Sequence, residues 1–341
     1  MPVESNRFTN NSELGFIERL VQNYSKLVIV MVIIFCCVFI YGMVTAPNFL
    51  TLFNLKTIVR DAALVGIMAI GLTFVTLSGN FFLLSMKETA ALCIIAFATG
   101  MSNGYGFELS FLFTMCFAIL AGVFQGALIG LGGNPIVVTL GAAGVLYGAG
   151  AYWSDNLVLS YRRPHGAEWL GSGSFLGLPN ITVAFILIAI SAELVLRKTN
   201  FGRQVYLIGA NRAAGKATGH ENFAMAIKCC TIASVCSAFV AIAFSAQFSS
   251  AQVNYFSSEF GSSGDMTIMV IATVMVGGNS IMGGYGSTLR SSLGAIFISS
   301  LDNMMVLHGF NSGPRVFAVG IMIVFSIIVF ALVRRGSRSE E

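Results

Sequence analysis

Charged residues are scarce in this chain, where Asp, Glu, Lys and Arg together make up 10% of the 341 residues. Soluble domains typically contain about one-quarter charged residues, so this composition excludes an ordinary soluble domain. Hydrophobic residues make up 56% instead. Several apolar runs approach the length of about 20 residues that crosses a hydrocarbon core roughly 30 Å thick. The sequence therefore predicts a membrane protein with many spans.

The chain also lacks the patterns of a metal site, a disulfide framework or a catalytic centre. No Cys-x-x-Cys pair occurs, and His165, His220 and His308 lie far apart without a carboxylate at a useful spacing. The seven cysteines fall in or beside apolar runs, where a free cysteine behaves as a small hydrophobic residue. We therefore expect no bound metal and no enzymatic activity in this chain.

A nucleotide-binding loop is missing as well. Residues 210–217 read ANRAAGKA, which lacks the first Gly and the final Ser or Thr of a phosphate-binding loop, and no strand pattern precedes them. We expect no cofactor here, so an ATPase that drives transport would be a separate chain. The net charge of +4 lies in loops and termini, and it indicates topology rather than binding to nucleic acid.

The apolar runs predict an all-α membrane protein of about ten transmembrane helices with short broken or re-entrant segments. Interfacial helices are predicted over 13–24 and 49–60. The third and eighth runs are weak, so nine crossings, or eight plus a re-entrant segment, stay open. The runs cover about 27–45, 62–77, 88–101, 109–131, 136–153, 181–196, 224–246, 266–276, 293–307 and 316–333.

The distribution of cations predicts which side of the membrane holds the termini. With ten spans, one side carries Lys56, Arg60, Arg162, Arg163 and Arg315, and the rest of the 19 Lys and Arg residues share the side of both termini. An excess of cations marks the cytoplasmic side. We therefore expect a cytoplasmic segment over 1–26, one permease domain over 27–333 and a cytoplasmic tail over 334–341.

The longest polar interruption after the middle of the chain is the stretch 197–223. It carries five cations and a single acid, Glu221, and a basic loop of this kind is predicted to be cytoplasmic. Asn211 can cap a short helix that Gly219 can end. Such a helix suits docking against a soluble partner. The alternative interpretation is a solvated loop whose charges only set topology.

Polar residues inside the predicted spans are the candidates for a translocation pathway. Asp302 is the clearest, because an acid within a membrane is costly and is by default a functional candidate; it either binds a polar solute or pairs structurally. Amides, hydroxyls and aromatic rings suit a neutral hydroxylated solute, although Ser and Thr can instead bond their own helix. The predicted pathway residues are Asn80, Phe81, Phe82, Gln125, Asp302 and Asn303.

Four stretches in order resemble the permease subunits of bacterial ABC importers of the ribose/galactose type, also called the second carbohydrate uptake family. They are 66–75 (GIMAIGLTFV), 134–141 (NPIVVTLG), 200–211 (NFGRQVYLIGAN) and 277–287 (GGNSIMGGYGS). The likeness covers about residues 49–332. It implies a type II ABC importer-like fold in the bacterial cytoplasmic membrane, surrounded by lipid.

The resemblance also implies partners and a function. A second permease subunit, identical or related, would complete the pore, and an extracytoplasmic binding protein would deliver a sugar or polyol. A cytoplasmic ABC ATPase would dock on the loop at 197–223. The residues that would shape that contact are Phe201, Gly202, Arg203, Gly209, Asn211, Ala213 and Gly219.

Two departures separate this chain from the family pattern. Residues 79–85 read GNFFLLS where the family usually reads GGIDLS, and 267–269 read TIM where it usually reads Glu-Leu-Asp, with Asp265 just upstream. These changes predict an unusual solute, or pairing with a second and more standard permease.

The alternative function is an ion-coupled secondary transporter of a small polar solute, although the sequence shows no clear internal repeat.

Overall fold

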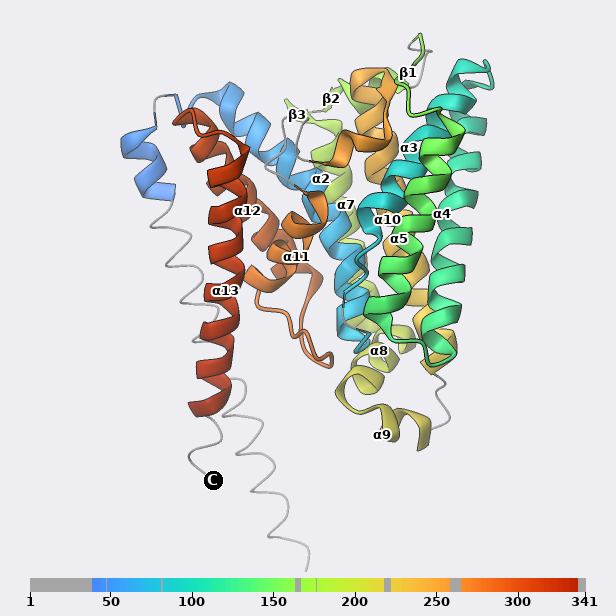
Figure 1. Ribbon diagram of the computed structural model, residues 1–341. Helices are drawn as coiled ribbons and strands as arrows, with labels where there is room; N and C mark the ends of the chain where they lie inside the picture. The colour runs from blue at the N-terminus through green and yellow to red at the C-terminus, as the bar shows by residue number, and fades with distance from the viewer. Residues whose placement is uncertain are drawn as a thin grey trace, which may run out of the picture.

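The computed structural model describes residues 39–46, 48–80, 82–162, 167–175, 177–217, 222–257 and 265–336. In this part the chain forms a bundle of helices (Figure 1). The α-helices are α2 (Leu52–Leu77), α3 (Met86–Ser102), α4 (Gly106–Gly130), α5 (Pro135–Trp153), α6 (Ala167–Gly171), α7 (Asn180–Lys198), α8 (Asn200–Ala210), α9 (Arg212–Ala217), α10 (Asn222–Phe248), α11 (Met266–Val276), α12 (Thr288–Leu307) and α13 (Ser312–Gly336). The remaining elements are the 3-10 helix η1 (Val253–Phe256) and the strands β1 (Leu159–Ser160), β2 (Ser174–Phe175), β3 (Leu178–Pro179) and β4 (Ser250–Ala251).

Five of the described helices, α2, α4, α5, α7 and α10, are long and apolar enough to cross a membrane. The helix α11 is shorter and has the bounds expected from the sequence, 266–276. Its 11 residues span only about 16 Å at 1.5 Å per residue, so it is a half-helix, as the weak eighth run indicated. Most of the first predicted span and the interfacial helix at 13–24 lie outside the described residues, and the count of ten spans stays a prediction.

Two central helices, α2 and α10, organise the core. Every residue of α2 from Ala62 to Leu77 is buried, and α10 packs along α4 through a seam of small residues. A Cβ at Gly122 or Gly126 would lie 2.5 Å from a backbone atom of α10, so the glycines at 122, 126 and 130, four residues apart, allow the two helices to approach closely. Gly144 and Gly148 have the same spacing, but a Cβ at either position would have no neighbour within 4 Å.

The prediction of an interfacial helix over 49–60 is wrong. The residues from Leu52 onward belong to α2, which runs without a break to Leu77. No proline or glycine interrupts the first part of α2, and Thr51 caps its start by accepting a hydrogen bond of 3.3 Å from Asn54 N. A pair of hydrogen bonds between Asn54 and Asn303 then fixes this end of α2 against α12. Tertiary contacts therefore extend the helix beyond the apolar run.

The polar stretch 155–179 contains short ordered elements. Strand β1 pairs antiparallel with β4, and β2 pairs antiparallel with β3. Figure 1 shows these strands at one end of the bundle, whereas α8, α9 and the C-terminal end of α13 lie at the other. The two ends of the molecule are therefore built differently, with a strand-containing cap opposite a pair of short helices.

Candidate functional site

The helix α8 follows α7 after a sharp turn at Thr199. The Thr199 Oγ1 atom accepts a hydrogen bond of 3.2 Å from Gly202 N, which caps α8. A Cβ at Gly202 would lie 2.0 Å from the carbonyl oxygen of Leu196, so only glycine fits at this turn. The exposed side of α8 carries Arg203, Leu207 and Ala210 at helical spacing. This side is available to a partner at the end of the bundle.

The opposite side of α8 contacts the backbone of two other segments. A Cβ at Gly209 would lie 1.8 Å from the carbonyl oxygen of Leu77, at the end of α2, and 2.7 Å from Gly284 N. Gly284 N in turn donates a hydrogen bond of 3.0 Å to the Leu77 carbonyl. The end of α2, the turn at 277–287 and α8 therefore meet backbone to backbone. A movement of α8 acts directly on the other two segments.

The helix α9 is capped as the sequence predicts. Asn211 Oδ1 accepts a hydrogen bond of 2.9 Å from Ala213 N. From the same helix, Arg212 Nη2 donates to the carbonyl oxygen of Gly79 at 2.6 Å and to Asn80 Oδ1 at 3.0 Å. The segment that follows α2 is thus tied to α9 as well as to α8.

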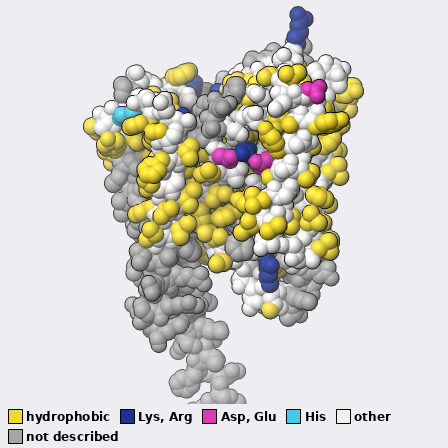
Figure 2. Space-filling view, viewed as in Figure 1, with side chains coloured by type: hydrophobic (Ala, Val, Ile, Leu, Met, Phe, Trp, Pro, Cys, Tyr) yellow, Lys and Arg dark blue, Asp and Glu magenta, His cyan; other side chains and the backbone are white. Residues whose placement is uncertain are grey.

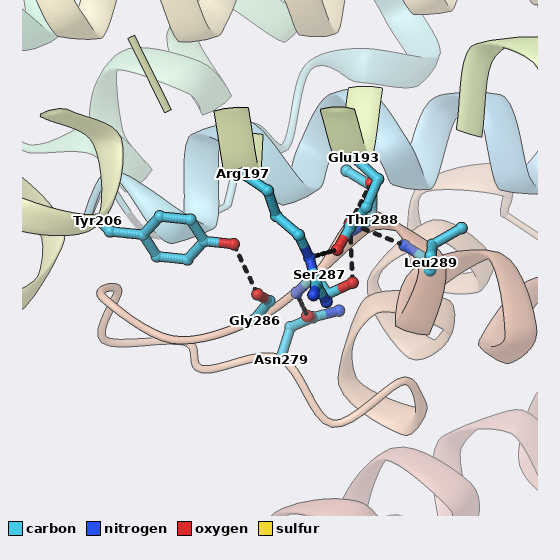
Figure 3. A network of polar contacts seen from close by, with 8 residues as sticks. All are labelled: Glu193, Arg197, Tyr206, Asn279, Gly286, Ser287, Thr288 and Leu289. Carbon is cyan, nitrogen blue, oxygen red and sulfur yellow. Dashed lines mark hydrogen bonds and ion pairs between the residues drawn. The ribbon is translucent and has the colours of Figure 1, made fainter. Parts of the chain in front are cut away.

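Glu193, near the end of α7, joins α7 to the start of α12 (Figure 3). Its Oε2 atom accepts hydrogen bonds from Ser287 Oγ at 2.8 Å, Thr288 Oγ1 at 2.8 Å and Thr288 N at 2.9 Å. Its Oε1 atom accepts one of 2.5 Å from Arg197 Nε. A carboxylate at a helix N-terminus satisfies free N–H groups and interacts well with the helix dipole. Glu193 therefore fixes the turn at 277–287 to the helix that leads into α8.

Tyr206 adds a second link between α8 and the same turn. Its Oη atom donates a hydrogen bond of 2.8 Å to the carbonyl oxygen of Gly286 (Figure 3). Burial, helped by the nearby charge of Glu193, raises the pKa of Tyr206, so the phenol remains protonated and able to donate. Sequence reasoning missed both Glu193 and Tyr206 as linking residues. The available signal was the spacing of Glu193 and Arg197, four residues apart at the end of a helix.

The predicted ATPase-contact residues that the structure describes all lie on α8 and α9 or on the capping residue between these helices. Arg203, Asn211 and Ala213 are exposed. Phe201 instead packs inward and stacks on Phe74, with ring centroids 6.1 Å apart. The two glycines of the set, at 202 and 209, serve close backbone contacts, and Gly219 lies outside the described residues.

The predicted pathway residues do not come together at one place. Asn80 is fully buried beside Ser78 and the α9 arginine, and the nearby Phe82 packs partly buried against the core. Gln125, on α4, is also fully buried, and its Oε1 atom accepts a hydrogen bond from Ser85 Oγ. Phe81 lies outside the described residues.

Asp302 and Asn303 lie on α12, each with a partner from another helix. Both oxygens of Asp302 accept hydrogen bonds from Arg315, at 2.8 Å from Nε and 2.7 Å from Nη2. Asn303 exchanges two amide hydrogen bonds with Asn54, at 2.8 and 2.9 Å. Asp302 is therefore paired within the chain, and the role of either residue in a pathway stays a prediction.

Long apolar helices around a buried centre, with a short basic helix pair projecting at one end, indicate a multi-pass membrane protein. Residues 54–331 match the family described as "Branched-chain amino acid transport system / permease component", and the chain belongs to this family. It is the permease subunit of a bacterial ABC importer, not itself an enzyme, and ATP is handled by a partner ATPase. Importers of this class also work with a binding protein.

Curated relatives extend over most of the chain. The Autoinducer 2 import system permease protein LsrC of Enterobacter sp. (strain 638) is 27% identical over 300 residues, covering 87% of this chain and 85% of the relative. The Probable ABC transporter permease protein YphD of Escherichia coli (strain K12) is 28% identical, covering 96% and 95%. The Ribose import permease protein RbsC of Bacillus subtilis (strain 168) is 28% identical, covering 83% and 86%. No solved structure matches the chain.

Proposed function

We propose that this chain forms the translocation pathway for a sugar or a sugar-like polyol, together with a second permease subunit. The names of its relatives support this solute class, because they include a ribose import permease and autoinducer 2 import permeases. An extracytoplasmic binding protein delivers the solute. The chain lies in the cytoplasmic membrane with both termini inside, which fits the excess of Lys and Arg in loops on that side.

The ATPase docks on the exposed side of α8 and on α9. The observation that carries this assignment is the double-sided environment of α8. One side presents Arg203 and Leu207 to solvent, while the other contacts the end of α2 and the turn at 277–287 through backbone atoms at Gly209. A partner that moves α8 therefore moves two core segments with it. ATP binding on the partner would use this contact to switch the bundle between inward and outward openings.

Uptake into proteoliposomes tests the proposed function. The permease is reconstituted with its ATPase and binding protein, and the uptake of radiolabelled ribose is measured with ATP enclosed, in competition with a panel of other pentoses, hexoses and autoinducer 2. We expect uptake that requires ATP and the binding protein and that at least one member of the panel suppresses. Uptake driven by an ion gradient without the ATPase would contradict the proposal and favour a secondary transporter.

The composition of the pore is tested separately. Native mass spectrometry of the purified complex counts the distinct permease chains. One chain type with full transport indicates a homodimer and removes the idea of a more standard partner subunit. Two chain types in equal amounts indicate a heterodimer, in which the unusual segments at 79–85 and 267–269 have a counterpart in the other subunit.

A further inference from the structure

Three charged side chains meet between α3 and α11. Lys87, in the first turn of α3, donates a hydrogen bond to Asp265 Oδ2, and its Nζ atom lies 3.4 Å from Glu88 Oε1. The distribution of cations in the sequence predicts Lys87 on the cytoplasmic side, but the structure places Lys87 within α3. Its side chain is 18% exposed, that of Glu88 14% and that of Asp265 34%. We call these three residues the Lys87 cluster.

The length of α11 places the Lys87 cluster near the middle of the membrane. Asp265 caps the start of α11, where its Oδ1 atom accepts a hydrogen bond of 2.9 Å from Thr267 N. The other end of α11 leads into the turn at 277–287, which contacts α8. The 11 residues between these ends span about 16 Å, roughly half of a hydrocarbon core of about 30 Å. Lys87 contacts Asp265 and therefore lies at the same depth.

The surroundings of the cluster exclude a position facing lipid. On the face seen in Figure 2, charged side chains are few among hydrophobic and uncharged ones. Charged groups at the centre of a bilayer are costly and face protein or a water-filled cavity. Asp265 is exposed enough to contact water in the isolated chain. The face that carries the cluster is thus covered by a second subunit, lines the pathway between subunits, or does both.

The cluster also retains unused hydrogen-bonding capacity. Among the described residues, Glu88 Oε2 is buried and has no hydrogen-bond partner. An unsatisfied carboxylate oxygen in a buried position is costly unless a donor reaches it. Lys87 adds a cationic donor, and carboxylates accept hydrogen bonds from hydroxyl groups. Adjacent hydroxyls of a polyol offer both a donor for Glu88 Oε2 and an acceptor for Lys87.

We propose that Lys87, Glu88 and Asp265 line the translocation pathway at its midpoint and bind hydroxyl groups of the solute as it passes. This assignment rests on the proposed function. The cluster is placed to respond to the ATPase, because Asp265 belongs to the half-helix whose other end joins the turn contacting α8. Movement of α11 relative to α3 changes the distance between Asp265 and Lys87. Solute is held while the two helices are together and is released when they separate.

Cysteine accessibility tests the position of the cluster without requiring a known solute. Lys87→Cys and Asp265→Cys are prepared in the complex with the ATPase in lipid nanodiscs. A charged, membrane-impermeant methanethiosulfonate reagent is added with and without ATP and vanadate. We expect labelling above that of the unsubstituted chain, with a rate that differs about tenfold or more between the two nucleotide conditions, because switching a pathway between two openings changes the exposed population by at least that factor. Native Cys93, fully buried on the same helix, is the internal control and stays unlabelled.

Failure of the proposed function and failure of the pathway assignment give different results. If the wild-type chain retains no ATPase, the proposed function fails, and the assignment of the pathway that rests on it fails as well. If the complex hydrolyses ATP but neither cysteine is labelled, or both are labelled equally under both conditions, the proposed function stands and the pathway assignment is overturned.

A second variant covers the case in which the cysteine variants do not assemble. Asp265→Asn removes the charge but keeps a side-chain oxygen that caps a helix as well as aspartate does. We expect the complex to assemble and to hydrolyse ATP, while the amount of radiolabelled ribose moved per ATP falls about tenfold, the loss expected for one charge-assisted hydrogen bond. Lys87→Arg keeps the charge, so we expect it to move nearly as much ribose per ATP as the wild type. If the role of the Lys87 cluster were purely structural, the variants would assemble less well, and the amount of ribose moved per ATP would be unchanged.

Discussion

Tyr206 of α8 donates a hydrogen bond of 2.8 Å to the carbonyl oxygen of Gly286, in the turn that precedes α12. This bond crosses from the helix that we propose as the ATPase contact to a segment of the permease core. It runs beside the close backbone approach at Gly209 and the carboxylate of Glu193, so three different kinds of contact hold the same turn. Single substitutions at Tyr206, Gly209 and Glu193 separate the effects of these three contacts.

Tyr206→Phe removes only the hydroxyl of this link. A typical hydrogen bond contributes about 1 kcal/mol to stability, so we expect the complex to form and its thermal unfolding temperature to fall only slightly. We expect the amount of solute moved per ATP to fall more, because α8 then contacts the turn only through the backbone approach at Gly209. Tyr152→Phe, at a side chain that is 88% exposed, is the matched control. Equal coupling in both variants would show that the Tyr206 bond transmits nothing.

Gly209→Ala tests the backbone contact between α8 and the end of α2. The added methyl would lie 1.8 Å from the Leu77 carbonyl oxygen, so α8 must shift, at a cost of roughly 1–3 kcal/mol or more. We expect loss of bound ATPase in a pull-down from nanodiscs. Gly144→Ala is the control, because no atom lies within 4 Å of the position of its added methyl. Retained ATPase binding in Gly209→Ala would show that this close approach is not needed for docking.

Glu193→Ala tests the carboxylate that caps α12. The change leaves Thr288 N and both hydroxyls without their acceptor and removes the partner of Arg197. Hydrogen bonds to a charged group contribute about 1.5–3 kcal/mol each, and we expect a loss of stability of about that size. Thermal unfolding measures it, with Glu108→Ala at an exposed position as the control. A melting temperature equal to that of the control would contradict the capping role.

Variants of Asp302 and Arg315 distinguish a structural role of Asp302 from a role in the translocation pathway. Breaking a buried ion pair from one side costs roughly 3–5 kcal/mol, because the other charge is left unpaired. If the pair is structural, Asp302→Asn and Arg315→Gln each destabilise the chain, and the double variant is destabilised by less than the sum. Thermal unfolding of the three variants gives this cycle. Additive losses, with uptake changed only by Asp302→Asn, would instead support the predicted contact of Asp302 with solute.

The sequence predicted local features well where the signal lies within one segment. The apolar run expected over 136–153 is α5, and the bounds of α11 and the Asn211 cap of α9 also follow from capping residues and apolar runs. The spacing of the glycines at 122, 126 and 130 predicts close helix packing, but it does not predict that α10 is the partner. The features within one segment depend on neighbours in the chain, so one sequence suffices to find them.

The sequence could not predict contacts between segments that lie far apart in the chain. Lys87 and Asp265 are separated by 178 positions, and Glu193 and Thr288 by 95, and nothing in the sequence pairs them. The residues predicted to form one pathway were chosen by polarity alone, and the structure distributes them over separate contacts. Polarity identifies residues that need a partner inside a membrane, but it does not say whether the partner is the protein or the solute.

ATP hydrolysis in the co-purified complex tests whether α8 and α9 form the docking site for the ATPase. The wild-type chain is compared with a variant carrying both Arg203→Ala and Asn211→Ala, which changes an exposed residue of α8 and the cap of α9. We expect that an ATPase chain co-purifies with the wild type, and that the double change releases it or separates its ATP hydrolysis from transport. Absence of any bound ATPase on the wild-type chain in nanodiscs, or unchanged coupling in the double variant, would contradict the assignment of α8 and α9 as the docking site.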